Sequence, residues 1–122
     1  MSPIDEKTLQ LRQAMYFCTC TENYYTNEHL SFEYTDGVKT FCETAGAYWL
    51  LDLVESVIKT KAELNNDLIG ITLTVKEDNT ARIAFRKGVR LVYYQKIPFT
   101  DCPKGKWKFY YQGKVFFWNM EY

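Results

Sequence analysis

The chain has 122 residues, of which 47% are hydrophobic, and fifteen Lys and Arg side chains balance fifteen Asp and Glu side chains. This length and apolar fraction predict one folded domain over residues 1–122 and exclude global disorder. No apolar run reaches the roughly 20 residues that cross a bilayer, and no export signal opens the chain. We therefore expect a cytoplasmic protein that does not bind membranes.

The sequence predicts helices in the first half of the chain. Residues 2–5 (Ser-Pro-Ile-Asp) are typical of a helix start, and this helix should end near residue 18. The polar, Tyr-containing stretch 18–35 fits either a short helical turn or a loop over the core. Thr35 or Asp36 is then expected to cap a second helix, which the apolar pattern extends from residue 38 to about residue 64.

Alternating apolar and polar residues predict strands throughout the second half. These strand segments lie at residues 69–75, 81–86, 89–93, 106–111 and 115–118. Most are separated by short turns, which join antiparallel neighbours. We therefore expect an α+β fold, in which the mainly helical residues 1–67 pack on one face of an antiparallel β-meander of about five strands formed by residues 68–122.

The two halves carry opposite charge. Residues 1–67 hold eleven acidic and five basic side chains, a net of −6, whereas residues 68–122 hold ten basic and four acidic side chains, a net of +6. Basic and aromatic side chains that alternate outward on the strands are expected to form a partner-binding face: Arg82, Arg86, Arg90, Tyr94, Lys106, Lys108 and Tyr110. The plain alternative is a solvated face whose lysines prevent pairing at the sheet edge. The same side chains suit single-stranded nucleic acid or an acidic protein surface.

The sequence offers little for catalysis or metal binding. It has no phosphate-binding glycine loop, no dinucleotide motif and no nucleophile elbow. Cys18 and Cys20 form a C-x-C pair without the second ligand pair of a zinc site, and His29 is the sole histidine. We therefore expect no catalytic residue, no metal and no cofactor. In a reducing compartment all four cysteines should be free thiols, Cys42 and Cys102 included.

One carboxylate stands within an apolar stretch. Asp52 follows Tyr48-Trp49-Leu-Leu, so the sequence predicts a buried acid that accepts hydrogen bonds from the other half of the chain. The alternative is a functional acid with a raised pKa. Tyr48 and Trp49 are expected to supply large buried area, while Gly37 allows a tight helix start and Gly46 lets another backbone approach. The resulting structural motif comprises Asp36, Gly37, Gly46, Tyr48, Trp49 and Asp52.

Two segments carry a resemblance to a known family. Tyr34-Thr-Asp-Gly-Val-Lys-Thr-Phe41 and Ala45-Gly-Ala-Tyr-Trp-Leu-Leu-Asp52 resemble a pattern in a family of small, uncharacterised phage and mobile-element proteins, a domain of unknown function. The Tyr24-Tyr25 pair and the β-rich second half are also similar to this family. The family has no established catalytic residues, so the resemblance transfers none. It implies a phage or mobile-element protein that acts inside a bacterium.

We expect this small chain to act by binding rather than by catalysis. The leading hypothesis is a non-enzymatic inhibitor of a bacterial defence system, of the anti-CRISPR type, which binds a host defence protein that handles nucleic acid. The second hypothesis is a nucleic-acid-binding accessory or regulatory protein that uses the basic aromatic sheet face. An alternative interface for the first hypothesis is acidic and comprises Glu22, Glu28, Glu33 and Asp36.

Overall fold

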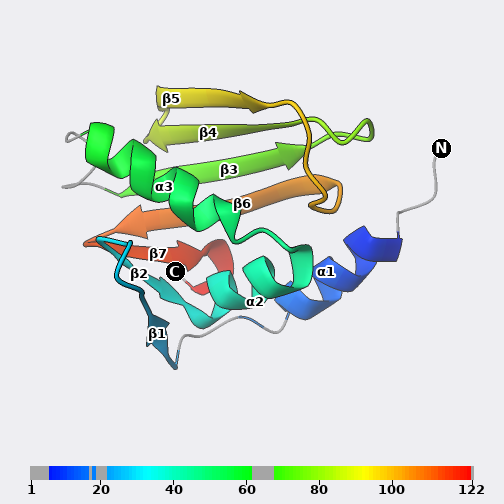
Figure 1. Cartoon of the computed structure of the whole chain (residues 1–122), viewed down its shortest axis with the longest axis horizontal. Helices are drawn as coiled ribbons and strands as arrows, with labels where there is room; N and C mark the ends of the chain where they lie inside the picture. Colours follow the sequence, from blue (N-terminus) through cyan, green and yellow to red (C-terminus); the bar gives the residue numbers. More distant parts are fainter. Residues whose placement is uncertain (1–5, 17, 19–21, 62–67, 122) are drawn as a thin grey trace.

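Helices and strands segregate into two layers. The computed structural model describes residues 6–16, 18, 22–61 and 68–121. Within them the chain forms α1 (Glu6–Tyr16), β1 (Tyr24–Tyr25), β2 (Glu33–Thr35), α2 (Asp36–Ala45), α3 (Trp49–Thr60), β3 (Ile69–Val75), β4 (Ala81–Lys87), β5 (Arg90–Ile97), β6 (Gly105–Gln112), β7 (Val115–Trp118) and the 3₁₀ turn η2 (Asn119–Glu121). The α3 helix crosses in front of β3 and β6 (Figure 1). The α+β prediction is therefore confirmed.

The sheet is larger than predicted and is mixed rather than purely antiparallel. Among the described residues it has seven strands in the order β1-β2-β7-β6-β3-β4-β5. The five strands expected in the second half are present, and two more come from the unassigned stretch 18–35. These two are too short, at two and three residues, for alternation to reveal them. The β2 strand pairs in parallel with β7, with Glu33 opposite Val115.

The single long helix predicted over residues 38–64 is wrong, because α2 ends at Ala45 and α3 begins at Trp49. Gly46 adopts the left-handed conformation at φ 64° and its N–H donates to the Cys42 carbonyl, a typical helix end. Among the described residues no atom lies within 4 Å of the position that a Cβ on Gly46 would take. Gly46 therefore ends a helix and does not admit a close backbone. The predicted helix start at residues 2–5 lies outside the described residues.

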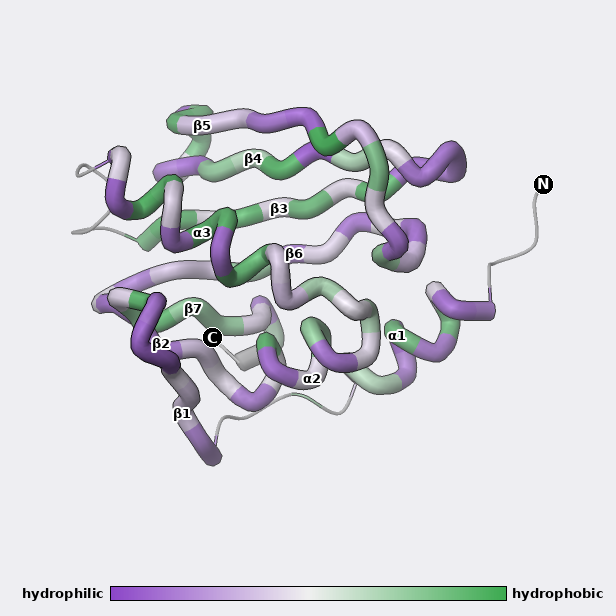
Figure 2. Tube along the Cα trace, in the orientation of Figure 1, coloured by the Kyte–Doolittle hydropathy of each residue, from purple (hydrophilic) through white to green (hydrophobic). Residues whose placement is uncertain are grey.

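Aromatic side chains join the helices to one face of the sheet. Phe41 of α2 packs edge-on against Trp107 and Phe109 of β6, with ring centroids 5.7 and 5.0 Å apart. Phe32 packs in the same manner against Tyr111 and Phe116. Hydrophobic segments concentrate in β3, β4, β7 and α3 (Figure 2). The core thus lies between the helices and the inner face of the sheet, and the outer face has no helix over it among the described residues.

The structure corrects the prediction for the motif around Asp52. Asp52 is exposed, Tyr48 is 46% exposed and Trp49 is half-buried. The buried stripe of α3 runs along Leu50 and its helical neighbours, and this stripe places Asp52 on the opposite side of the helix. Gly37 is buried in the first turn of α2.

Candidate functional site

The outer face of β3, β4, β5 and β6 gathers most of the predicted partner-binding residues. Strand register places Thr74 between Lys106 and Arg82, and Arg82 opposite Lys96. The next rows bring Tyr94, Lys108, Tyr110 and Arg86 to the same side. We call this surface the cationic face and define it by Arg82, Arg86, Tyr94, Lys96, Lys106, Lys108 and Tyr110. It unites residues of β4, β5 and β6 that the sequence separates by up to 28 positions.

Charge on the cationic face is of one sign. The four strands contain no Asp or Glu. All five of its Arg and Lys side chains are exposed, and none forms an ion pair with another described residue. Arg82 and Lys96 are direct cross-strand neighbours, an arrangement in which like charges repel. A bound anion would relieve this repulsion.

Two hollows lie on this face, and each combines at least two cations with one tyrosine. The first has a volume of about 340 Å³ and lies among Arg86, Lys108 and Tyr110. The second, of about 350 Å³, lies among Arg82, Lys96 and Tyr94, and Lys76 adds a third cation to its lining. The same pairing of charge with an aromatic ring therefore occurs twice on one sheet.

The floor between the hollows is made of small side chains. Gly70, Thr72, Thr74 and Ala84 occupy the outward positions of β3 and β4. A Cβ on Gly70 would lie 3.8 Å from Cε1 of Tyr110, so this ring lies close over the glycine backbone. Because these side chains are small, a flat group can lie against the strands while the longer Arg and Lys side chains reach around it.

Sequence reasoning misplaced one residue of the face and missed another. A bulge between Phe85 and Arg86 shifts the register of β5, so that Arg90 pairs with Lys87. Lys87 lies opposite the buried Ile69, and Arg90 therefore belongs to the helix side of the sheet. Lys96 was missed, although it lies two positions after Tyr94 and follows the same alternation. Val89, expected to begin the strand, is 96% exposed in the turn.

Asp36, one of the four residues of the alternative acidic interface, accepts hydrogen bonds from within the chain. Asp36 accepts hydrogen bonds from the backbone N–H groups of Glu22 and Asn23, both at 2.9 Å, and from the Tyr25 hydroxyl at 2.8 Å. Partial burial opposes ionisation of Asp36, but these donors outweigh it and lower its pKa. Thr35, which precedes α2, makes no side-chain capping bond to the helix. Asp36 thus fastens the β1 segment to α2.

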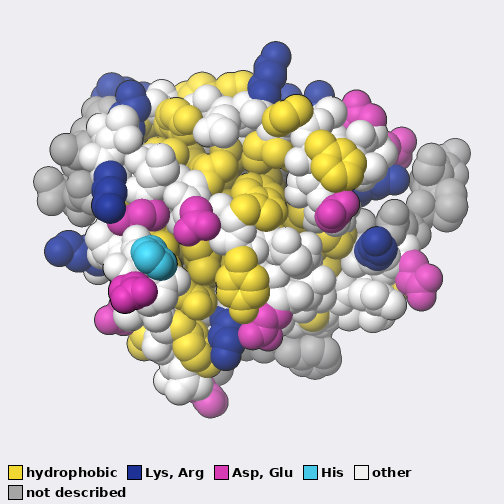
Figure 3. All heavy atoms as spheres, viewed as in Figure 1, with side chains coloured by type: hydrophobic (Ala, Val, Ile, Leu, Met, Phe, Trp, Pro, Cys, Tyr) yellow, Lys and Arg dark blue, Asp and Glu magenta, His cyan; other side chains and the backbone are white. Residues whose placement is uncertain are grey.

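The remaining acidic candidates are exposed around the β1–β2 segment. They are Glu22, Glu28 and Glu33. Glu28 lies 3.7 Å from the imidazole of His29, and both side chains are largely exposed. The helix side of the molecule shows hydrophobic side chains at its centre with charged ones of both signs around them (Figure 3). Single-sign charge is therefore a feature of the cationic face rather than of the molecule as a whole.

The described residues contain no group of three or more His, Cys, Asp or Glu side chains that could hold a metal ion. Cys42 and Cys102 are free thiols, and Cys20 lies outside the described residues. Burial raises the pKa of Cys42 and of Cys102 to about 12, which disfavours a nucleophilic thiolate at either site. In the part of the chain that the structure describes, no helix is long and apolar enough to cross a membrane.

Comparison with known proteins identifies one family. A family profile described as "Family of unknown function (DUF6876)" matches residues 9–122. No curated protein and no solved structure shows significant similarity to the chain. The match agrees with the expected membership of an uncharacterised family, and it assigns no residue a role.

Proposed function

We propose that the chain, which belongs to the DUF6876 family of unknown function, is a non-enzymatic protein. It binds single-stranded nucleic acid on its cationic face. The observation that carries the proposal is the combination of at least two cations and a tyrosine around each hollow of that face. Single-stranded nucleic acid presents the same combination, a phosphate and a stackable base, in every nucleotide.

The spacing of the cations across the sheet fits the repeated phosphates of a nucleic-acid strand better than it fits a single anion. Neighbouring strands lie about 4.8 Å apart, so Arg82 on β4 and Lys106 on β6 are separated by about two such steps. The cations thus spread across the face rather than converge on one point. The small floor around Gly70 leaves room for bases to lie beside Tyr110.

The second candidate is the inhibitor of a bacterial defence protein, encoded by a phage or mobile element. The exposed Tyr94 favours it, because Tyr and Arg together are typical of protein interfaces, and an acidic protein surface would satisfy the same cations. The resemblance of the Tyr34–Asp52 segment to phage and mobile-element proteins gives this candidate its biological setting. We rank it second because an acidic protein surface does not require a hollow beside each tyrosine.

The test is fluorescence anisotropy with a labelled oligothymidylate of about 12 nucleotides, within the site sizes of single-strand binders. The double variant Arg86→Glu with Lys108→Glu should weaken binding at least about tenfold, equivalent to about 1.4 kcal/mol. The matched control is Lys7→Glu with Lys61→Glu on the helix side, which changes the net charge equally and should bind nearly as the parent does. The logarithm of the affinity should fall with that of salt concentration, with a slope of about −3 for four phosphate contacts.

Tyrosine variants separate stacking from charge. Tyr94→Ala and Tyr110→Ala should each cost about 1–3 kcal/mol of binding, whereas Tyr24→Ala, which removes an exposed ring elsewhere, should cost nothing. Equal losses in the two charge variants would overturn the assignment of the cationic face. No binding of the oligonucleotide at low salt, combined with a protein partner that survives nuclease and high salt, would favour the second candidate.

A further inference from the structure

A third cavity lies at the junction of α1, β6, β7 and η2, apart from the two hollows of the cationic face. It has a volume of about 610 Å³ and is lined by Arg12, Met15, Tyr16, Lys106, Trp107, Trp118 and Met120. This volume falls within the roughly 300–1,000 Å³ of typical small-molecule sites. Among the described residues the lining has aromatic rings, two thioethers and no carboxylate. We propose that this cavity binds a planar aromatic molecule that carries one negative charge, such as an aromatic carboxylate or sulfonate.

The walls are fixed in place before any ligand arrives. The indole N–H of Trp107 donates to the carbonyl of Pro103 at 3.1 Å, which sets the orientation of the ring. The Thr8 hydroxyl donates to the carbonyl of Lys104 at 2.9 Å and ties α1 to the loop before β6. Trp107 and Met15 are 3% and 2% exposed, so their positions are held by the core. A preformed apolar wall costs little ordering on binding.

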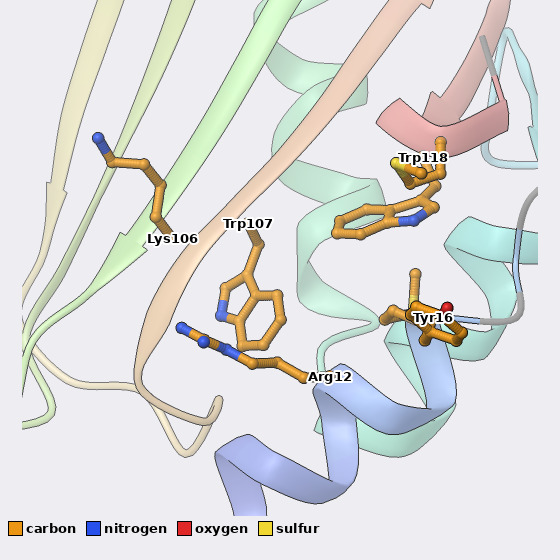
Figure 4. A pocket seen from close by; sticks show the side chains of 7 residues that line it. Arg12, Tyr16, Lys106, Trp107 and Trp118 are labelled. Carbon is orange, nitrogen blue, oxygen red and sulfur yellow. The ribbon is translucent and has the colours of Figure 1, made fainter. Parts of the chain in front are cut away.

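Arg12 supplies the charge that selects an anion. Its guanidinium carbon lies 6.0 Å from the centroid of the Trp107 ring, and Figure 4 shows the group beside that indole at the edge of the cavity. Arg12 is exposed and forms no ion pair with another described residue. Gly105 makes this arrangement possible, because a Cβ there would lie 3.2 Å from the Trp107 ring and 3.6 Å from Nη2 of Arg12.

The opposite side of the cavity offers a surface for a flat ring. Trp118 lies across from Trp107 and Arg12, and Tyr16 extends from α1 (Figure 4). Lys106 points to the other side of β6, toward the cationic face (Figure 4). A ligand between the two indoles could therefore place its aromatic ring against the apolar wall and its anionic group at Arg12.

The test compares two dyes that differ in charge, 1-anilinonaphthalene-8-sulfonate and its uncharged analogue N-phenyl-1-naphthylamine. Both should bind the full chain saturably at one site, with energy transfer from tryptophan. In Arg12→Gln the Kd of the sulfonate should rise about tenfold, while that of the neutral dye should change less than about twofold. The control Arg86→Gln removes a cation from the cationic face and should leave both dyes unaffected. An unchanged thermal melt of Arg12→Gln establishes that the fold is retained.

Four results would overturn the proposal. They are equal effects of Arg12→Gln on the two dyes, a loss of sulfonate binding in Arg86→Gln, non-saturable dye binding, and no sulfonate binding at all. Three of them concern Arg12, which lies outside the cationic face, or the dyes alone, and the Arg86→Gln result would place the dye on the cationic face without deciding whether that face binds the oligonucleotide. The two proposals therefore stand or fall separately.

Discussion

The carboxylate of Glu55 accepts two hydrogen bonds from Ser31, one from the backbone N–H at 2.9 Å and one from the hydroxyl at 2.8 Å. Glu55 is only 7% exposed, and its other oxygen lies 3.4 Å from the ammonium group of Lys59. This contact fastens the loop between β1 and β2 to α3. The buried acid that the sequence predicts at Asp52 is therefore found one helical turn later, at Glu55.

Glu55→Ala should destabilise the fold, because it removes the acceptor of both Ser31 donors. Hydrogen bonds to charged groups contribute about 1.5–3 kcal/mol, and Ser31 is exposed enough to be rehydrated, so we expect a loss of about 1–2 kcal/mol. Thermal unfolding followed by circular dichroism should show a Tm lower by about 4–8 °C. Asp52→Ala is the control and should shift the free energy of unfolding by less than about 0.5 kcal/mol. The reverse order would restore the assignment of Asp52 as the buried acid.

Stability should fall in acid through carboxylates whose pKa values are lowered in the folded state, among them Glu55 and Asp36. Burial opposes ionisation of Glu55, but the Ser31 donors and Lys59 outweigh it and lower its pKa; Asp36 is lowered in the same way by its amide donors. A lowered folded pKa stabilises the protein above the unfolded pKa of about 4, and this stability is lost as the pH falls through the folded pKa. Urea midpoints measured between neutral pH and about pH 3 should decrease, and decrease less in Asp36→Asn. An identical pH profile in the variant would remove Asp36 from this account.

The thiols should react at different rates in the native protein. Cys42 and Cys102 are buried, with pKa values raised to about 12, whereas Cys18 is half-buried. Titration with Ellman's reagent at neutral pH should therefore modify Cys18 well before the two buried thiols. Under denaturing, non-reducing conditions all four thiols of the chain should react. A count of zero there would contradict the expected reducing compartment.

Gly46→Ala should destabilise the protein by about 1–2 kcal/mol, because a residue with a Cβ is strained in the left-handed region. Gly46 has φ 64°, and open space surrounds the position of the added methyl among the described residues, so any cost comes from the backbone and not from a clash. Gly46→Asn provides the comparison, since asparagine tolerates this conformation better than alanine. Chemical denaturation should rank the parent above the Asn variant and the Asn variant above the Ala variant. Equal stability of the two variants would indicate that φ is not the cause.

Sequence periodicity predicted those elements whose buried side follows a regular pattern within the element itself. The inward alternation of β3 from Ile69 to Val75 is as predicted, since period-two burial follows from the pleat. The β1 and β2 strands were missed because their stability comes from pairing with distant residues rather than from their own pattern. The break at Gly46 was missed because a glycine between alanines continues an apolar helical pattern, and its left-handed conformation is set by the chain that follows.

The residues of the candidate site were partly predictable from the alternation of side chains along the strands. Alternation identified Arg82, Arg86 and Lys108 on one face, and strand register confirms that they share it. The bulge beside Arg86 inserts one residue into β5, and a shift of one position moves side chains to the opposite face, so Arg90 was misassigned. The cavity beside Arg12 could not be predicted, because it joins α1 to the end of the chain through contacts that no local pattern encodes.

Variants of Lys96, the cross-strand neighbour of Arg82, can distinguish a role in binding from a role in protecting the sheet edge. Lys96 lies on the edge strand β5, where a charge also prevents pairing with other chains. Lys96→Gln removes the repulsion with Arg82, so the free energy of unfolding should rise by about 0.5 kcal/mol at low salt, and this gain should vanish at high salt. Affinity for the oligonucleotide should fall about threefold, consistent with one lost phosphate contact, whereas the charge-retaining control Lys96→Arg should change neither quantity. If Lys96→Gln instead forms oligomers in analytical ultracentrifugation and binds the oligonucleotide as the parent does, then Lys96 protects the sheet edge and does not belong to the binding surface.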